Sequence, residues 1–190
     1  MEKALHRDEI FDKIDFTENP LPIGEYENCT FIQCNFSQTN LSNIIFIESS
    51  FTGCNLSMPK TNNTAFRKIL FKDCKLLGVH FENCNSFLLE LTFENCLLNL
   101  SSFYKLTIKN TLFDHCSLHE VDFTAANLTS STFRDCELND AIFDGTNLEK
   151  TDFRTAVNYS IDPEINRIAN ARFALQGIAG LLNKYDISIE

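Results

Sequence analysis

The stretch FTAANLTSSTFRDCELNDAIF, residues 123–143, decides the fold. A large apolar residue recurs at every fifth position, and the residue two places before each is small, as in Ala126-Asn127-Leu128 and Cys136-Glu137-Leu138. A period of five matches neither the helical repeat of 3.6 nor the simple strand repeat of two. It therefore predicts short extended segments that each point one small and one large side chain inward before the chain turns.

The same register extends outward from this stretch. It runs unbroken from Phe93 to Phe153, and from Phe16 to Phe81 it is interrupted by Thr61 alone. Large apolar residues hold 26 of these 27 positions, and such persistence at a fixed period is typical of a solenoid.

The cysteines predict the size of one coil. Six of the eight follow each other at sequence intervals of 20, 20, 22, 20 and 20, and they are Cys34, Cys54, Cys74, Cys96, Cys116 and Cys136. Because the regular interval equals four pentapeptides, one coil has four sides, and these six cysteines are predicted to stack as a core ladder. The single longer interval predicts a two-residue insertion near Ser86–Leu91. Pro59 and Thr61 replace the usual inward residues, so that side is expected to be distorted and to bulge outward.

The chain resembles the pentapeptide-repeat family, whose consensus is A-(D/N)-L-x-x. Units that carry the resemblance include Cys34-Asn35-Phe36, Cys54-Asn55-Leu56 and Thr151-Asp152-Phe153. The resemblance covers residues 16–157 and implies an all-β fold, a right-handed quadrilateral β-helix of about seven coils. At an interstrand spacing of about 4.8 Å, such a rod is about 34 Å long.

The ends of the chain are expected to differ from the repeat. Residues 1–15 are predicted to form an N-terminal cap in which Ile10, Phe11 and Ile14 pack on the core, residues 16–158 the β-helix, and residues 159–190 a C-terminal capping and dimerisation segment. Within 171–184 a short helix is expected, with one apolar stripe made by Phe173, Ile178, Leu181 and Leu182. That helix must dock on its own last coil or on a second subunit. We expect a homodimer about 70 Å long, with residues 185–189 alternating like a strand.

Composition excludes several classes of function. The 190 residues carry a net charge of −10, so direct binding to nucleic acid lacks its basic footprint. Apolar runs are too short to span a membrane, and the charged N-terminus lacks a signal peptide, which predicts a cytoplasmic location where thiols stay reduced. The eight cysteines are predicted to pack inward rather than bind metal. His115 and His119 are expected to face solvent, with Cys116 inward. No catalytic residues, metal or cofactor are expected, and the protein is not expected to be an enzyme.

The acidic residues gather toward the C-terminal end. Residues 112–167 hold eleven acidic and four basic side chains, and seven of the acidic residues are the candidate partner-binding face: Asp114, Glu120, Asp122, Asp135, Glu137, Asp140 and Asp144. Glu120 and Asp140 are separated by one full coil of the predicted repeat and are expected to stack, with Glu137 on the same side. A merely solvated acidic face is the alternative interpretation.

Within the family, the chain resembles the Qnr-type and microcin-immunity-type proteins in length, acidity and its apolar C-terminal segment. That resemblance implies a DNA mimic that binds a type II topoisomerase such as DNA gyrase and dimerises through its C-terminus. The chain departs from loop-bearing Qnr-type members because no long loop interrupts its coils, so protection against quinolones is not implied. The alternative is a structural or scaffolding interaction module with another partner.

Overall fold

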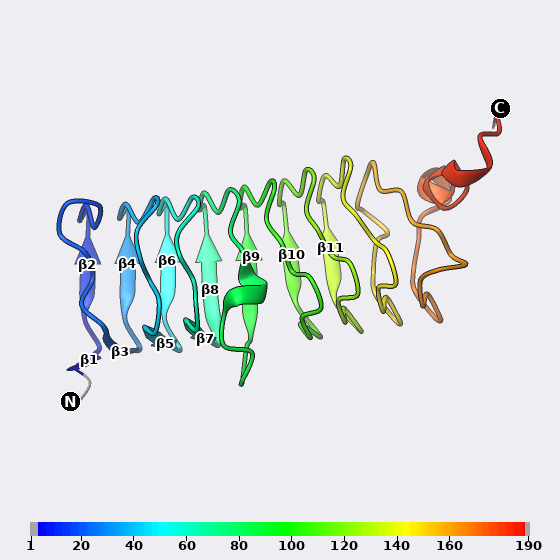
Figure 1. Ribbon diagram of the computed structural model, residues 1–190. Helices are drawn as coiled ribbons and strands as arrows, with labels where there is room; N and C mark the ends of the chain where they lie inside the picture. Colours follow the sequence, from blue (N-terminus) through cyan, green and yellow to red (C-terminus); the bar gives the residue numbers. More distant parts are fainter. Residues whose placement is uncertain (1–3, 189–190) are drawn as a thin grey trace.

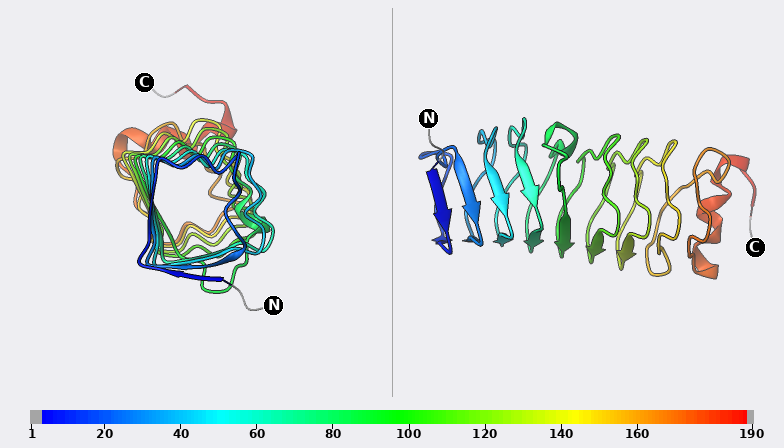
Figure 2. Two further views of the ribbon diagram at one scale, coloured as in Figure 1. Left: turned by 90° about the vertical axis from the view of Figure 1, so that its left-hand side faces the viewer. Right: turned by 90° about the horizontal axis from the view of Figure 1, so that it is seen from below.

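The computed structural model describes residues 4–188 as a four-sided rod (Figure 1). Seen along its axis, successive coils superpose as a nearly square outline (Figure 2). Equivalent residues of successive coils pair with each other, as Phe31 does with Phe51 and Phe113 with Phe133. This register confirms the predicted coil of four pentapeptides. We number the four faces in chain order from the first coil, with residues 4–8 on the first face.

Parallel strands cover two adjacent faces. The first face carries a four-stranded sheet in the order β1 (Ala4–Arg7), β3 (Gly24–Glu27), β5 (Ile45–Ile47) and β7 (Ala65–Arg67). The second face carries a seven-stranded sheet of β2 (Ile10–Asp12), β4 (Thr30–Ile32), β6 (Ser50–Thr52), β8 (Ile69–Lys72), β9 (Leu91–Glu94), β10 (Leu112–Asp114) and β11 (Thr132–Arg134). The third and fourth faces are joined by single bridges, such as Asn55 to Lys75 and Asp122 to Ile142.

Each pentapeptide bonds to both neighbouring coils. The amide of Phe36 donates to the carbonyl of Asn55 at 2.7 Å, and the amide of Asn55 donates back to Cys34 at 3.0 Å. The last residue of most units turns the corner in the left-handed region, for example Asp140 with φ of 56°. Asn and Asp tolerate this conformation better than most residues, which explains why many corners carry them.

The core is built from stacked side chains. On the second face an unbroken column of Phe rings runs from Phe11 to Phe173, with neighbouring centroids 4.7–5.5 Å apart. The six-cysteine ladder lies beside it, as predicted. The Cys34 amide donates to Cys54 Sγ at 3.3 Å, and the Cys54 thiol donates to the Phe31 carbonyl at 3.4 Å. All eight cysteines are free and buried.

The insertion lies where the cysteine spacing predicted it. Ala65 still pairs with Asn85, but Ile69 pairs with Leu91, so the two extra residues fall within 86–90. Phe87 and Leu88 point into solvent there. The Arg67 guanidinium lies 5.5 Å from the centroid of the Phe87 ring.

The predicted bulge at Pro59 and Thr61 is wrong, because both residues are buried. Their side stays joined to the preceding coil, where the Lys60 amide donates to Thr39 at 2.8 Å and the Leu41 amide to Lys60 at 2.9 Å. Toward the next coil the Thr61 hydroxyl donates to the His80 carbonyl at 2.8 Å. The distortion is confined to that next coil, which turns through the 3-10 helix η1 (Phe81–Asn83).

The N-terminal segment is part of the solenoid and not a separate cap. β1 and β2 begin the two sheets, His6 stacks on Tyr26 at 4.6 Å, and Phe11 stacks on Phe31 at 4.7 Å. The predicted inward packing of Ile10 and Ile14 is wrong, since Ile10 is 71% exposed and Ile14 is also exposed. Ile10 stands at an outward position beside Phe11, whereas Ile14 stands at the inward position of the cysteine ladder, one coil before Cys34, on the first coil of the rod.

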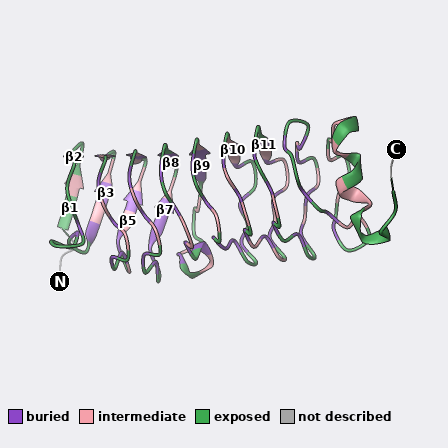
Figure 3. Ribbon diagram, turned by 90° about the horizontal axis from the view of Figure 1, so that it is seen from above, coloured by how far each residue is buried: buried purple, intermediate pink, exposed green. Residues whose placement is uncertain are grey.

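The coil register also continues past residue 158. The Leu148 amide donates to the Arg167 carbonyl and the Phe153 amide to Arg172, both at 2.8 Å. Asn158 and Pro163 occupy the positions where apolar residues are expected, which hides this continuation in the sequence. The chain then forms the 3-10 helices η2 (Leu175–Leu181) and η3 (Asn183–Tyr185), largely exposed in Figure 3. The described residues 185–188 form no strand, contrary to the expectation, and the last residue of that predicted strand lies outside the described part.

Candidate functional site

The seven predicted partner-binding acids do not share one face. The coil register places Asp114 and Asp135 on the second face, Glu120, Glu137 and Asp140 on the third, and Asp122 and Asp144 on the fourth. The predicted stacking of Glu120 and Asp140 is consistent with the coil pairing, because the Glu120 amide donates to Asn139 at 2.9 Å.

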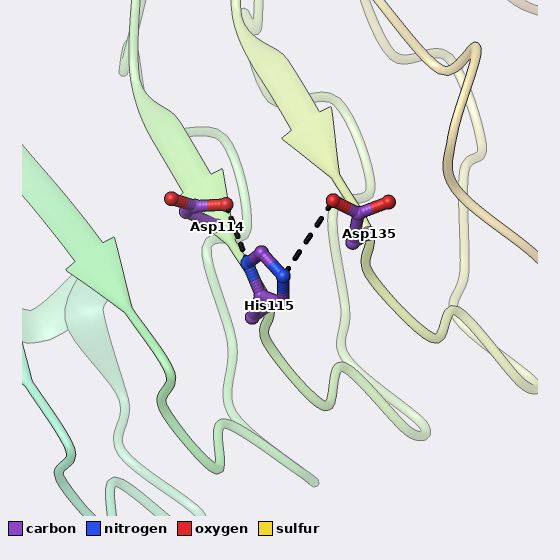
Figure 4. A group of neighbouring side chains, drawn as sticks. All are labelled: Asp114, His115 and Asp135. Atoms are coloured by element: carbon purple, nitrogen blue, oxygen red, sulfur yellow. Dashed lines mark hydrogen bonds and ion pairs between the residues drawn. The ribbon is translucent and has the colours of Figure 1, made fainter.

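The second-face acids are engaged in ion pairs (Figure 4). His115 Nδ1 lies 2.8 Å from Asp114 and its Nε2 lies 3.6 Å from Asp135, while Arg134 reaches Asp114 at 3.4 Å. The ligand atoms of Asp114, His115 and Asp135 lie within 4.8 Å of one another. The two carboxylates approach different nitrogens of the ring, however, so the arrangement suits a bridged ion pair better than the coordination of one metal ion.

The third-face acids are free. Glu120, Glu137 and Asp140 are exposed, and their side chains form no hydrogen bond or ion pair within the described residues 4–188. On the fourth face, Asp144 is equally unpaired among those residues, whereas Asp122 accepts the Thr124 amide at 2.8 Å. We call these five residues the acidic corner. The sequence does indicate the ion pair of Asp114 with Arg134, since residues one full coil apart lie next to each other on the same face.

The charge of this half is therefore one-sided. The third- and fourth-face segments, residues 116–125, 136–145 and 156–165, hold seven acidic and no basic residues. The first- and second-face segments, residues 106–115, 126–135 and 146–155, hold four of each sign. The negative field consequently projects from two of the four faces.

Charge also alternates along the rod. Residues 1–59 hold nine acidic and three basic side chains, residues 60–109 four and seven, and residues 110–190 thirteen and six. The net values are −6, +3 and −7. The N-terminal end is thus nearly as acidic as the C-terminal end. The prediction of an acidic face considered residues 112–167 and missed this second acidic end.

The C-terminal segment docks on its own last coil. The Ile161 amide donates to the Gly180 carbonyl at 2.9 Å, and Tyr159 lies buried beneath η2. A Cβ added at Gly177 would overlap the Tyr159 hydroxyl, and one at Gly180 would overlap the Tyr159 carbonyl oxygen. Both glycines are needed for this close approach.

The predicted dimerisation residues have different environments. Phe173 and Leu181 pack against the protein's own core, with the Phe173 ring stacked 5.4 Å from Phe153. Leu182 is half-buried, and Ile178 is exposed. Leu175 is 81% exposed and was missed, because the predicted helical stripe assumed a longer α-helix beginning at residue 171.

An ion-pair clamp fixes the end of the chain. Lys184 Nζ lies 2.8 Å from Asp162 and 2.6 Å from Glu164, and the Tyr185 hydroxyl donates to Glu164 at 2.9 Å. The Lys184 ammonium, through its hydrogen bonds, lowers the pKa of both carboxyl groups. Asp162 and Glu164, two of the seven acidic residues of the third and fourth faces, are therefore neutralised. The other five are the residues of the acidic corner.

Burial keeps the thiols unreactive. The side chain of Cys84 is enclosed, which raises its thiol pKa to about 12. A hydrogen bond donated by the Cys96 thiol to the neighbouring Cys116, together with burial, likewise raises the pKa of Cys96. All eight thiols are buried, so they pack the core and are not accessible as nucleophiles.

The coil geometry and the sequence repeat define a class, the pentapeptide-repeat β-helices. The pentapeptide repeat region pattern matches residues 25–92 and 86–157, and the chain belongs to this family. Its fold is similar to that of a trypsin-treated variant of QnrB1, a plasmid-mediated fluoroquinolone resistance protein, at a TM-score of 0.76. The two share 16% identity over 100% of this chain and 92% of the other. A second treated QnrB1 variant gives a TM-score of 0.54 at 18% identity, over 98% and 100% of the two chains.

No curated protein matches the chain. Within residues 4–188, no helix has the length and apolar character to cross a membrane.

Proposed function

We propose that this protein mimics DNA and binds a type II topoisomerase, with DNA gyrase as the expected partner, through the acidic corner. The observation that carries the proposal is the set of free carboxylates at Glu120, Glu137 and Asp140, which serve no pairing within the described residues. The flat side of the rod supports it, because five residues at about 3.3 Å make a face about 16 Å wide, comparable with a duplex once side chains are added.

The one-sided charge predicts how the partner approaches. A basic DNA-binding surface would meet the third and fourth faces of the C-terminal half, while the neutral first and second faces would stay in solvent. Because the attraction is electrostatic, binding should weaken as salt rises. This is a binding role and not a catalytic one.

A supercoiling assay with the topoisomerase of the native host tests the proposal. The E120K/E137K/D140K variant changes the charge by +6 and should lose inhibition while its circular dichroism stays unchanged. The matched control is E18K/E25K/E90K, which makes the same charge change at carboxylates away from the acidic corner and should keep inhibition. If the wild-type protein neither inhibits nor binds any type II topoisomerase at micromolar concentration, the proposal is wrong. Adding a fluoroquinolone to the same assay measures protection.

We further propose that two chains join through the C-terminal segment, in the cytoplasm, where the buried thiols stay reduced. Leu175 and Ile178 are exposed on η2 beside the last coil, and such apolar side chains gain from burial against a second copy. Light scattering should find a dimer for the wild type and a monomer for L175E/I178E. An unchanged mass in that variant would contradict this interface.

A further inference from the structure

Apolar side chains gather on the third face at the middle of the rod. Leu97 and Leu100 are exposed on one coil, Leu77 is half-exposed on the coil before it, and Met58 is exposed one coil earlier. Their coils are joined directly, since the Met58 amide donates to Leu77 at 2.8 Å and the Leu76 amide to Leu97 at 2.7 Å. All four residues point outward, so filling the core does not explain them. We call them the apolar patch.

Two of these residues are also poorly suited to their backbone. Met58 and Leu100 turn corners with φ of 50° and 63°. The left-handed region disfavours such side chains, and exposure to water disfavours them again. A surface that covers them would offset both costs.

Two basic residues lie beside the patch, Lys75 on the third face and Lys60 on the adjoining edge of the fourth face, and the third-face residues of the acidic corner follow along the rod. Lys60 and Lys75 are exposed, and no carboxylate of the described residues lies within 4 Å of either ammonium. Lys75 lies one coil before the Leu97–Leu100 coil, and Glu120 lies one coil after it. Lys60 lies two coils before, and Asp140 two coils after.

This arrangement is complementary to itself. Consider a two-fold axis that lies in the plane of the third face, perpendicular to the rod, at the Leu97–Leu100 coil. This axis places a second copy antiparallel to the first, with third face against third face. Leu97 and Leu100 then meet their own counterparts, Lys75 faces the coil of Glu120, and Lys60 faces the coil of Asp140. A parallel arrangement would instead oppose like charges on every coil, which is unfavourable.

From this geometry we infer that the third face is a weak, antiparallel self-association surface whose occupant is a second copy of this chain. Five coils of a 16 Å face make about 400 Å² per copy, about half of what a standard stable interface buries. The association is therefore weak and depends on protein concentration. It covers Glu120, Glu137 and Asp140, so, if the proposed function holds, self-association competes with the topoisomerase for the same carboxylates.

Other occupants fit this surface less well. An anionic membrane would be repelled by the net charge of −10. An acidic partner protein would satisfy Lys60 and Lys75 but would not use the mirrored placement of Glu120 and Asp140.

Charge exchange between copies tests the inference without any topoisomerase. Variant K60E/K75E places acidic residues on both sides of the axis, and variant E120K/D140K places basic residues on both sides. Each alone should associate at least about tenfold more weakly than the wild type, because like charges then oppose. An equimolar mixture should recover association to within about threefold of the wild type, since every facing pair is then opposite in charge. The control K105E/K109E makes the same charge change as K60E/K75E, but at the corner between the fourth and first faces and on the first face, away from the third face, and should associate as the wild type does.

The readout is a zero-length carbodiimide crosslink in mixed unlabelled and ¹⁵N-labelled full-length protein, identified by mass spectrometry. Wild-type protein should give intermolecular Lys75–Glu120 or Lys60–Asp140 peptides, whatever the C-terminal segment does. Absence of these peptides at about 1 mM, a concentration that suits weak contacts, overturns the inference. So does a mixture that fails to recover association. The crosslinks can form even if the protein does not inhibit supercoiling, so the two proposals can fail independently of each other.

Discussion

The coils before the insertion at 86–90 and those after it use the same pentapeptide differently. Before it, the first face carries a column of Tyr26, Phe46 and Phe66 beside the Phe column of the second, and the third face carries the stacked pair Phe16 and Phe36. After it, Phe columns occupy the opposite second and fourth faces, and Phe103 and Phe123 stack at 5.2 Å on the fourth. The first-face column ends at Phe66 and the fourth-face column begins at Phe81, on the coil just before the insertion, where the two rings lie tilted at 6.4 Å. The Phe column of the second face continues through both halves.

The outward residues explain why strands persist on the first face before the insertion and not after it. The strands β3, β5 and β7 carry Glu25, Ile45 and Ala65 at the second position of the unit, and none of these side chains can form an Asx turn. The equivalent later units carry Asn127 and Asn147, whose side chains accept the amides of Thr129 at 3.2 Å and Glu149 at 3.0 Å. Such Asx turns replace strand geometry with tight local turns. The fold therefore depends on the inward pattern, and the strand content on the outward one.

The largest expected effect comes from the core of either half. Replacing Phe123 or Phe46 by Ala removes a fully buried ring and should cost about 3–5 kcal/mol in the free energy of unfolding. Denaturant titration of both variants measures whether a ring of the adjacent columns before the insertion and a ring of the opposite columns after it contribute equally to the free energy of unfolding. A difference above about 2 kcal/mol between them would show that the two halves are not energetically alike. I10A, at an exposed position, should stay within about 0.5 kcal/mol.

A smaller effect on the free energy of unfolding is expected at the C-terminal end of the rod, where η2 contacts the last coil. In G180A the new methyl group would meet the Tyr159 backbone, so η2 must move away from the last coil, at a cost of about 1–3 kcal/mol. Hydrogen exchange over residues 175–188 should accelerate. The control G145A meets no atom within 4 Å but sits at φ of 62°. It should cost about 1 kcal/mol and leave exchange in 175–188 unchanged.

Acid should release the same end of the chain. Lys184 lowers the pKa of Asp162 and Glu164 from ordinary values of 3.8 and 4.5. Groups with a lowered folded-state pKa stabilise the fold above their unfolded values, and this contribution is lost as pH falls through the folded values. Proteolysis by pepsin at pH 4 down to 2 should therefore cut residues 175–188 progressively faster. K184A should already be cut fast at pH 4, and equal pH dependence in both proteins would contradict the clamp.

The sequence predicted the regular features and missed those that depend on side-chain partners. Equal spacing predicted the coil, the cysteine ladder and the insertion, because each follows from the chain period alone. The solenoid's true ends were missed because Asn158 and Pro163 interrupt the pattern, although Tyr159 and Ile161 fill the core there instead. The acidic face was predicted too broadly, because net charge along the chain does not show that Asp114 is paired with Arg134.

The smallest expected effect tests the insertion itself. Deleting Phe87 and Leu88 restores the regular four-pentapeptide interval between Cys74 and the next cysteine of the ladder, and both deleted side chains are exposed. The deletion removes a Leu at φ of 59°, which relieves about 1–2 kcal/mol of strain. It also removes the Arg67 contact with the Phe87 ring, which contributes about 0.5–1 kcal/mol at an exposed site. These opposing terms nearly cancel, so unfolding free energy should change by less than about 1 kcal/mol. Thermal melts and near-ultraviolet circular dichroism measure this, and a cooperative loss of the C-terminal half would show that the insertion is required for the aromatic column to change face.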